Sequence, residues 1–315
     1  MRYVLCLAII GLMAVPASAV VLDGSISGDG YAKRSVQQTQ TNFGDNQSEL
    51  NAGWAQVDSG VLWLTLTGNI QNNFNKLNIF IDSVPGGENQ LTPDTGSGGN
   101  NPTNDGWANK HATDQGDVNA DPNARFMFDA GFAADYMIIS RRGNAGGDRF
   151  DFDFSSVGNA SVVEASLDIF SGSDTGTNAS VGASGIGVSY DNSNVAGVGG
   201  GTGAADQSAA MAVQTGLELA IPLSAIGNPN LADIKISAMV NGSNHDFLSN
   251  QFLGALEPPQ DNLGGDGSGN FTSDIAQINL KNFSGDQFFF AVPEPGTIAL
   301  AGLALVGMLS ARRRD

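Results

Sequence analysis

The sequence predicts an all-β protein: an antiparallel β-sandwich with long loops rich in Gly, Asn and Asp. The 315 residues include 42 glycines, and only 15% of them are charged. Both values argue against a helical bundle, because glycine weakens helix interiors and surface helices need charged outer faces. Short segments in which every second residue is apolar recur along the middle of the chain, and this alternation is typical of half-buried strands.

The clearest strand is Val61 to Leu66, whose three leucines fall on one face. Lys76 to Asp82 repeats the alternation, as does Arg149 to Phe154, where Asp151 and Asp153 are expected on a solvated outer face. Glycine, asparagine and aspartate separate these segments and favour turns. Further strands are expected at Ala124 to Asp129, Asp135 to Ser140, Ser161 to Phe170, Leu217 to Pro222, Ile234 to Val240 and Ile275 to Leu280.

Two long polar stretches, Pro85 to Asp121 and Ser171 to Ser208, lie between the expected strands. Loops of this length are either functional or disordered insertions. We expect one β domain over residues 20–291, because a chain of this length suits one large β domain.

The N-terminus has the three parts of a secretory leader, which we assign to residues 1–19 as a signal helix. Arg2 supplies the positive charge, an apolar stretch follows, and Ala17-Ser18-Ala19 forms a small-residue cleavage site. The single cysteine, Cys6, lies inside this leader. Cleavage after Ala19 would leave a protein without thiol chemistry.

The C-terminus, residues 292–315, has the parts of a membrane stop signal. Pro293-Glu294-Pro295 precedes an apolar run from Thr297 to Ala311, and Arg312, Arg313 and Arg314 follow. As a transmembrane helix the run would span about 22 Å, short of the roughly 30 Å hydrocarbon core, so it crosses only with help from arginines held at the cytoplasmic surface.

This tail resembles the PEP-CTERM sorting signal of Gram-negative bacteria, in the order of motif, short apolar helix and arginine cluster. The resemblance implies recognition by an exosortase, a membrane enzyme thought to cut near the motif. It also implies transient membrane anchoring, release or attachment at the cell surface or in the extracellular matrix, and an association with exopolysaccharide production. A plain membrane anchor that is never processed is the alternative.

The start of the body resembles the β-sandwiches related to DOMON domains and family 9 carbohydrate-binding modules. The resemblance rests on Val21-Leu22-Asp23-Gly24, Leu50 to Trp54, Val61 to Thr67 and Leu77 to Asp82. It implies a structural or ligand-binding sandwich. Haem, known among relatives, is not supported, because no haem-binding Met and His pair matches by motif.

The formal net charge of −18 excludes most nucleic-acid binding, which depends on basic patches that release counterions. An acidic surface instead suits divalent cations. Asp117-Val118-Asn119-Ala120-Asp121 has the alternating spacing that begins an EF-hand loop, but Pro122 replaces the expected Gly and Phe128 the expected Glu. A calcium site of another kind, formed by Asp114, Asp117, Asn119 and Asp121, remains a hypothesis beside a solvated acidic loop. Asp261, Asp266 and Asn270 form a weaker cluster.

Catalytic signatures are scarce. The two histidines, His111 and His245, lie in polar segments, and no nucleophile elbow is present. Carboxylates are abundant, but abundance identifies no glycosidase pair. Trp107 lies in a polar loop, where an exposed indole could stack on a sugar ring or pack locally; we expect Trp54 and Trp63 in the core.

These observations predict a non-enzymatic exported protein with a structural or adhesive role. The expected partners are the secretion machinery, an exosortase and the membrane. A module that binds extracellular polysaccharide is the alternative, and a secreted hydrolase is the third reading.

Overall fold

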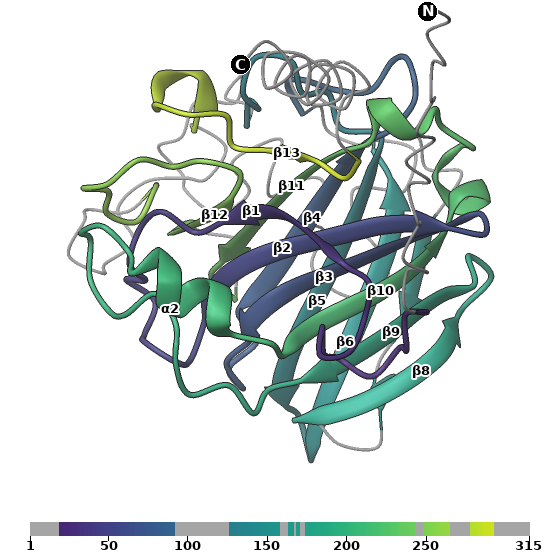
Figure 1. Ribbon diagram of the computed structural model, residues 1–315, viewed down its shortest axis with the longest axis horizontal. Coiled ribbons are helices and arrows are strands. Elements are labelled where there is room, and N and C mark those ends of the chain that lie inside the picture. Colours follow the sequence, from purple (N-terminus) through teal and green to yellow (C-terminus); the bar gives the residue numbers. More distant parts are fainter. Residues whose placement is uncertain are drawn as a thin grey trace, which may run out of the picture.

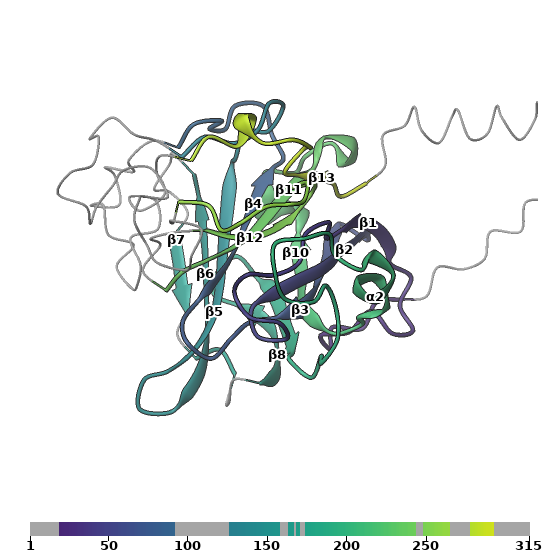
Figure 2. The ribbon, with the colours of Figure 1, turned by 90° about the vertical axis from the view of Figure 1, so that its left-hand side faces the viewer.

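The computed structural model describes residues 19–91, 126–157, 163–166, 168–170, 174–243, 248–264 and 278–292 (Figure 1). Within these ranges almost all regular structure is β, and the strands form two antiparallel sheets. Figure 2 shows the sheets as two layers, with β5 to β7 in one and β1 to β3 in the other. The expected all-β sandwich is therefore confirmed for the described part of the chain.

The first sheet has six strands. Their order is β1 (Ala32–Val36), β2 (Glu49–Asp58), β3 (Val61–Asn69), β10 (Gly216–Pro222), β9 (Ile186–Asp191) and β8 (Thr175–Val181).

The second sheet has seven strands, and its main path is β12 (Leu248–Leu253), β11 (Lys235–Asn241), β4 (Lys76–Asp82), β5 (Tyr136–Asn144), β6 (Asp148–Ser156) and β7 (Val163–Ser166). The short strand β13 (Phe289–Phe290) pairs with β11.

Helical segments are short. They are α2 (Gln207–Ala212) and the 3₁₀ turns η1 (Leu223–Ile226), η2 (Leu231–Asp233) and η4 (Leu280–Asn282). Asp206 caps α2, because its side chain accepts hydrogen bonds from the backbone N–H groups of Ser208 and Ala209.

The main core lies between the two sheets. The leucines of β3 pack there against the phenylalanines of β6, which alternate along their strand as the sequence predicts. Phe150 also contacts the rings of Phe170 and Tyr190, with centroids 4.8 and 5.0 Å apart. Burial of each large apolar side chain contributes about 1.5–3 kcal/mol, so this layer supplies most of the stability.

A second apolar cluster covers the other face of the seven-stranded sheet. Phe80, Met137 and Ile139 pack there against loop residues that include Phe126 and Phe128. This sheet is therefore buried on both faces, and the expected solvated face is wrong. Asp151 and Asp153 are 1% and 2% exposed, and Asp151 pairs with Arg141 and Arg149.

Most of the expected strands are present, with small shifts at their ends. Two are wrong within the described residues. Residues 126–129 form only an isolated bridge at Met127, and residues 278–280 form a bridge and the start of η4. The polar stretch from Ser171 to Ser208 is not one long loop, because it contains β8, β9 and the start of α2.

Both tryptophans expected in the core belong elsewhere. Trp54 and Trp63 are half-buried and belong to neither core cluster. Trp63 of β3 faces away from Leu62, Leu64 and Leu66, because successive side chains of a strand alternate between faces. Trp54 of β2 pairs with Thr65, which lies on the same outer face as Trp63.

Candidate functional site

A groove of about 430 Å³ lies beside β1, at the edge of the six-stranded sheet. One wall is Lys33 to Val36 of β1. The other is formed by Gly254 and Ala255 after β12 together with Asp286, Phe288 and Phe289. Figure 1 shows β1 and β13 running near each other. The volume falls in the range of small-molecule binding sites, about 300–1,000 Å³.

Backbone contacts fix the two walls relative to each other. Ser35 Oγ donates to the carbonyl of Gly254 at 3.1 Å and accepts from its N–H at 3.0 Å. The N–H of Ala255 donates to the carbonyl of Asp286 at 2.6 Å. Gly254 has a φ of 131°, and a Cβ there would lie 2.3 Å from the nitrogen of Phe288. The groove is thus part of the folded framework.

The β1 wall carries two cations. Lys33 is exposed, and its Nζ lies 3.3 Å from the sulfur of Met211. Arg34 is half-buried and donates from Nε to the carbonyl of Ala55 at 3.2 Å, and burial lowers the pKa of its guanidinium. Neither forms an ion pair with any residue that the structure describes.

The facing wall carries a carboxylate and an aromatic ring. Asp286 is exposed and Phe288 is half-buried. The Phe288 ring lies 5.8 Å from Nζ of Lys235, which is itself paired with Asp82 at 3.0 Å. Gln38 and Gln207 complete the polar lining. Such a surface can bind an anion at one wall and hydroxyl groups at the other.

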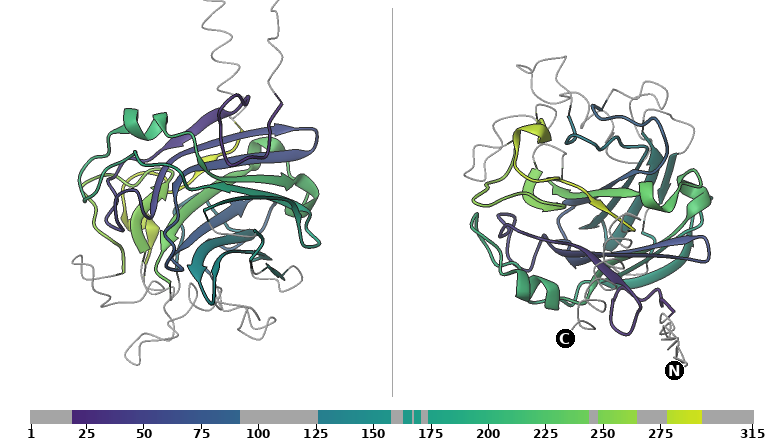
Figure 3. Two further views of the ribbon diagram at one scale, coloured as in Figure 1. Left: turned by 90° about the horizontal axis from the view of Figure 1, so that it is seen from below. Right: turned by 45° about the horizontal axis from the view of Figure 1, so that its top comes forward.

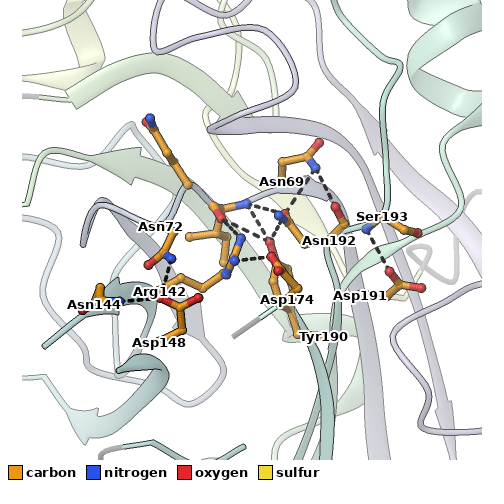
Figure 4. Close-up of polar contacts among 12 residues, drawn as sticks. Asn69, Asn72, Arg142, Asn144, Asp148, Asp174, Tyr190, Asp191, Asn192 and Ser193 are labelled. Atoms are coloured by element: carbon orange, nitrogen blue, oxygen red, sulfur yellow. Dashed lines mark hydrogen bonds and ion pairs between the residues drawn. The ribbon is translucent and has the colours of Figure 1, made fainter. Parts of the chain in front are cut away.

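A second polar cluster joins the sheets at one end of the sandwich (Figure 4). Arg142 of β5 donates from Nη1 to the carbonyl of Ile70 at 2.9 Å and forms an ion pair with Asp174. The hydroxyl of Tyr190 accepts from the N–H of Ile70 at 2.7 Å and donates to Asn192. Tyr190 is buried, and this desolvation raises the pKa of its phenol. The buried part of the cluster, Arg142 and Tyr190, holds strands of the two sheets together.

Two buried carboxylates form no ion pair with any residue in the described ranges. Glu218 accepts from the N–H groups of Asp23 and Gly24, both at 2.8 Å, and from the hydroxyl of Tyr31 at 2.6 Å. Glu49 accepts from Asn51 Nδ2 at 2.8 Å, and also from Asn46 and Asn194.

Burial raises the pKa of both carboxyls. Neither reaches a surface where it could transfer a proton to a substrate. Their hydrogen bonds therefore hold the N-terminal segment and the turn before β2 in place.

The residues that the sequence singled out lie mostly outside the described ranges. This holds for Ala17, Trp107, Asp114, Asp117, Asn119, Asp121, Pro293, Glu294, Pro295, Arg312, Arg313, Arg314 and both histidines. Ala19 is the first described residue and is exposed. Asp261 accepts from Asn42 Nδ2 at 2.6 Å, and its partners Asp266 and Asn270 are not described. The calcium and sugar sites stay predictions.

No group of three or more His, Cys, Asp or Glu side chains is placed to hold a metal ion within the described ranges. Among the same residues, no helix has the length and apolar character needed to span a membrane.

Sequence reasoning missed Lys33 and Arg34. The available signal was a basic dipeptide in a chain with only 14 basic residues.

Comparison with known proteins identifies the tail. Residues 291–314 match the PEP-CTERM protein-sorting motif. The chain is therefore an exported, cell-envelope-associated protein that an exosortase sorts to the cell surface. No curated protein and no solved structure matches the chain, so the resemblance of the body to DOMON and family 9 carbohydrate-binding modules stays a prediction.

Proposed function

We propose that the body is a non-enzymatic sandwich that serves a structural or adhesive role at the cell surface or in the extracellular matrix. The observation that supports this is that the folded body continues directly into the sorting motif, with no linker between the last described segment and the motif. Ala291 is fully buried and donates its N–H to the carbonyl of Ile234 at 2.9 Å, and the motif match begins at this residue. The cargo that the motif delivers is the sandwich itself.

The placement of the two ends is consistent with this role. The first and last described segments leave the same side of the sandwich (Figures 2 and 3). The rest of the surface is then free to face outward while the tail is in the membrane.

The test follows the native host. Full-length protein should appear in the surface or matrix fraction, and a variant truncated after Val292 should be lost from it. Deletion should weaken cell adhesion or matrix cohesion, and the full chain should restore it. Accumulation of the full-length chain in the cytosol, or normal adhesion and matrix after deletion, would contradict the proposal.

The second candidate function is binding of extracellular polysaccharide. It is favoured by the groove beside β1, where cationic, amide and aromatic side chains line one cavity. Saturable binding of the purified protein to the polysaccharide of its host is the expected result. Absence of binding would leave the structural or adhesive role standing alone.

A further inference from the structure

We infer that the groove beside β1 binds a saccharide unit that carries a carboxylate, such as a uronic acid residue of an acidic polysaccharide. The inference rests on the second candidate function and names its ligand class. Lys33 and Arg34 take the carboxylate, and the facing wall takes the sugar ring and its hydroxyls.

The β1 wall contains an arginine that has no carboxylate partner among the described residues. The other arginines within the described ranges, Arg141, Arg142 and Arg149, each pair with an aspartate. Arg34 is the one described arginine that forms no ion pair, although the chain has 32 acidic residues to offer. Its guanidinium is half-buried at a groove wall, and its hydrogen bond to the described residues comes from Nε. The two terminal nitrogens are the donors that bind a carboxylate in bidentate fashion.

Lys33 adds a second charge at the same wall. Its Nζ is exposed, and the contact it makes in the described structure is with the sulfur of Met211, a weak acceptor. Lys33 and Arg34 line the same groove, and neither forms an ion pair with a residue that the structure describes. An external carboxylate would satisfy both groups.

The facing wall suits a sugar better than a peptide or a simple anion. The carboxylate of Asp286 would repel a small anion but accepts hydrogen bonds from sugar hydroxyls. The amides of Gln38 and Gln207 can both donate to and accept from hydroxyls, and the Phe288 ring offers an apolar face for sugar C–H groups. Gly254 and Ala255 place no bulky side chain between the two walls.

The net charge of −18 does not prevent this binding. Repulsion between the protein as a whole and a polyanion is screened beyond about 8 Å at physiological ionic strength, whereas a carboxylate in contact with Arg34 is within hydrogen-bonding distance. Binding should therefore occur at physiological salt and weaken as salt is raised further.

The experiment uses the full-length protein in detergent and three polymers: polygalacturonate, neutral dextran and polyglutamate. We expect binding to polygalacturonate and little to the other two. Arg34→Gln should weaken that binding by about tenfold or more, since a charge-assisted hydrogen bond contributes about 1.5–3 kcal/mol. Lys281→Gln is the matched control, because Lys281 is exposed, lies outside the groove lining and loses the same charge. It should bind as the wild type does.

Lys33→Gln provides a second test that does not depend on the folding of the Arg34 variant, because Lys33 is exposed. It should reduce binding to polygalacturonate by several-fold. Equal binding of dextran with no effect of Arg34→Gln would overturn the inference but leave the polysaccharide function intact. Equal binding of polyglutamate would overturn the saccharide assignment. Failure to bind any of the host and test polysaccharides would overturn both the inference and the function on which it rests.

Discussion

Removal of the Phe289 ring should detach the chain segment that precedes the sorting motif. Phe289 is 6% exposed in the core between the sheets, and its ring lies against Gly53, where a Cβ would approach the ring to 2.9 Å. A buried Phe→Ala substitution costs about 3–5 kcal/mol. By contrast, β13 pairs with β11 over only two residues, and each backbone hydrogen bond contributes about 1 kcal/mol. The ring therefore holds β13 more strongly than the pairing does.

The assay is hydrogen exchange of the peptide that contains Ala291, whose N–H is bonded to Ile234. In Phe289→Ala this amide should exchange about 100- to 1,000-fold faster, while the amides of β3 and β4 stay protected. Phe290→Ala is the control, since the Phe290 ring is half-buried on the opposite face, 5.8 Å from Nζ of Lys235, and its loss should cost about 1 kcal/mol or less. Equal exchange in the two variants would refute the reasoning.

Three further predictions concern stability. Burial raises the carboxyl pKa of Glu218 in the folded state, so its contribution to stability is fully present below the ordinary value of 4.5 and is lost as pH rises through the folded pKa. In urea titrations the wild type should therefore lose stability relative to Glu218→Gln as pH rises above 4.5; parallel curves would contradict this. Arg142→Met should cost about 2–4 kcal/mol in urea unfolding, because it removes charge-assisted bonds. Asp174→Asn should lower the free energy of unfolding by about 1 kcal/mol or less, since the Asp174 side chain is 74% exposed. If Arg142→Met and Asp174→Asn lost the same stability, the buried bonds of the Arg142 guanidinium would not be the stabilising ones. Gly68→Ala places a Cβ 2.1 Å from the carbonyl of Glu49 and should cost about 2–4 kcal/mol in thermal unfolding, against about 1 kcal/mol for Gly60→Ala, which has open space; a reversed order would be inconsistent with the clash.

The strands that could be predicted from the sequence are those in which one face is apolar. β3, β4 and β6 alternate clearly because one set of their side chains enters the main core. β8 reads Thr-Gly-Thr-Asn-Ala-Ser-Val and lies at a sheet edge, so most of its side chains are at least partly exposed and carry no apolar pattern.

Other strands could not be predicted, because their polar side chains find hydrogen-bond partners only in distant parts of the sequence. The buried amide of Gln251 in β12 bonds to the carbonyl of Thr39 and to the N–H of Leu50, about 200 residues away. Its polarity is satisfied only in the fold, and from the sequence the strand resembles a loop. The burial of Asp151 was unpredictable for the same reason, since Arg141 and Arg149 neutralise it from neighbouring positions.

The groove could not be predicted, because no short stretch of sequence contains it. Lys33 and Arg34 come from the start of the body, and Gly254 comes from the loop after β12. Phe288 comes from the end of the body, shortly before the sorting motif. The hydrogen bonds of Ser35 with Gly254 and of Ala255 with Asp286 bring these segments together in the fold. The sorting signal was predictable because it is contiguous and is read as a linear motif.

Each sheet is completed by a strand from late in the chain inserting beside one from early in it. Leu64 pairs with Leu219 in the first sheet, and Ile79 with Ala238 in the second. Contacts so distant in sequence form slowly, because a long loop must close before they can stabilise anything. We therefore expect the polypeptide to remain open until its last third has been synthesised. The order of the strands therefore keeps both sheets incomplete while the chain is being exported. During that time, repulsion between the net negative charges of separate unfolded copies limits their association.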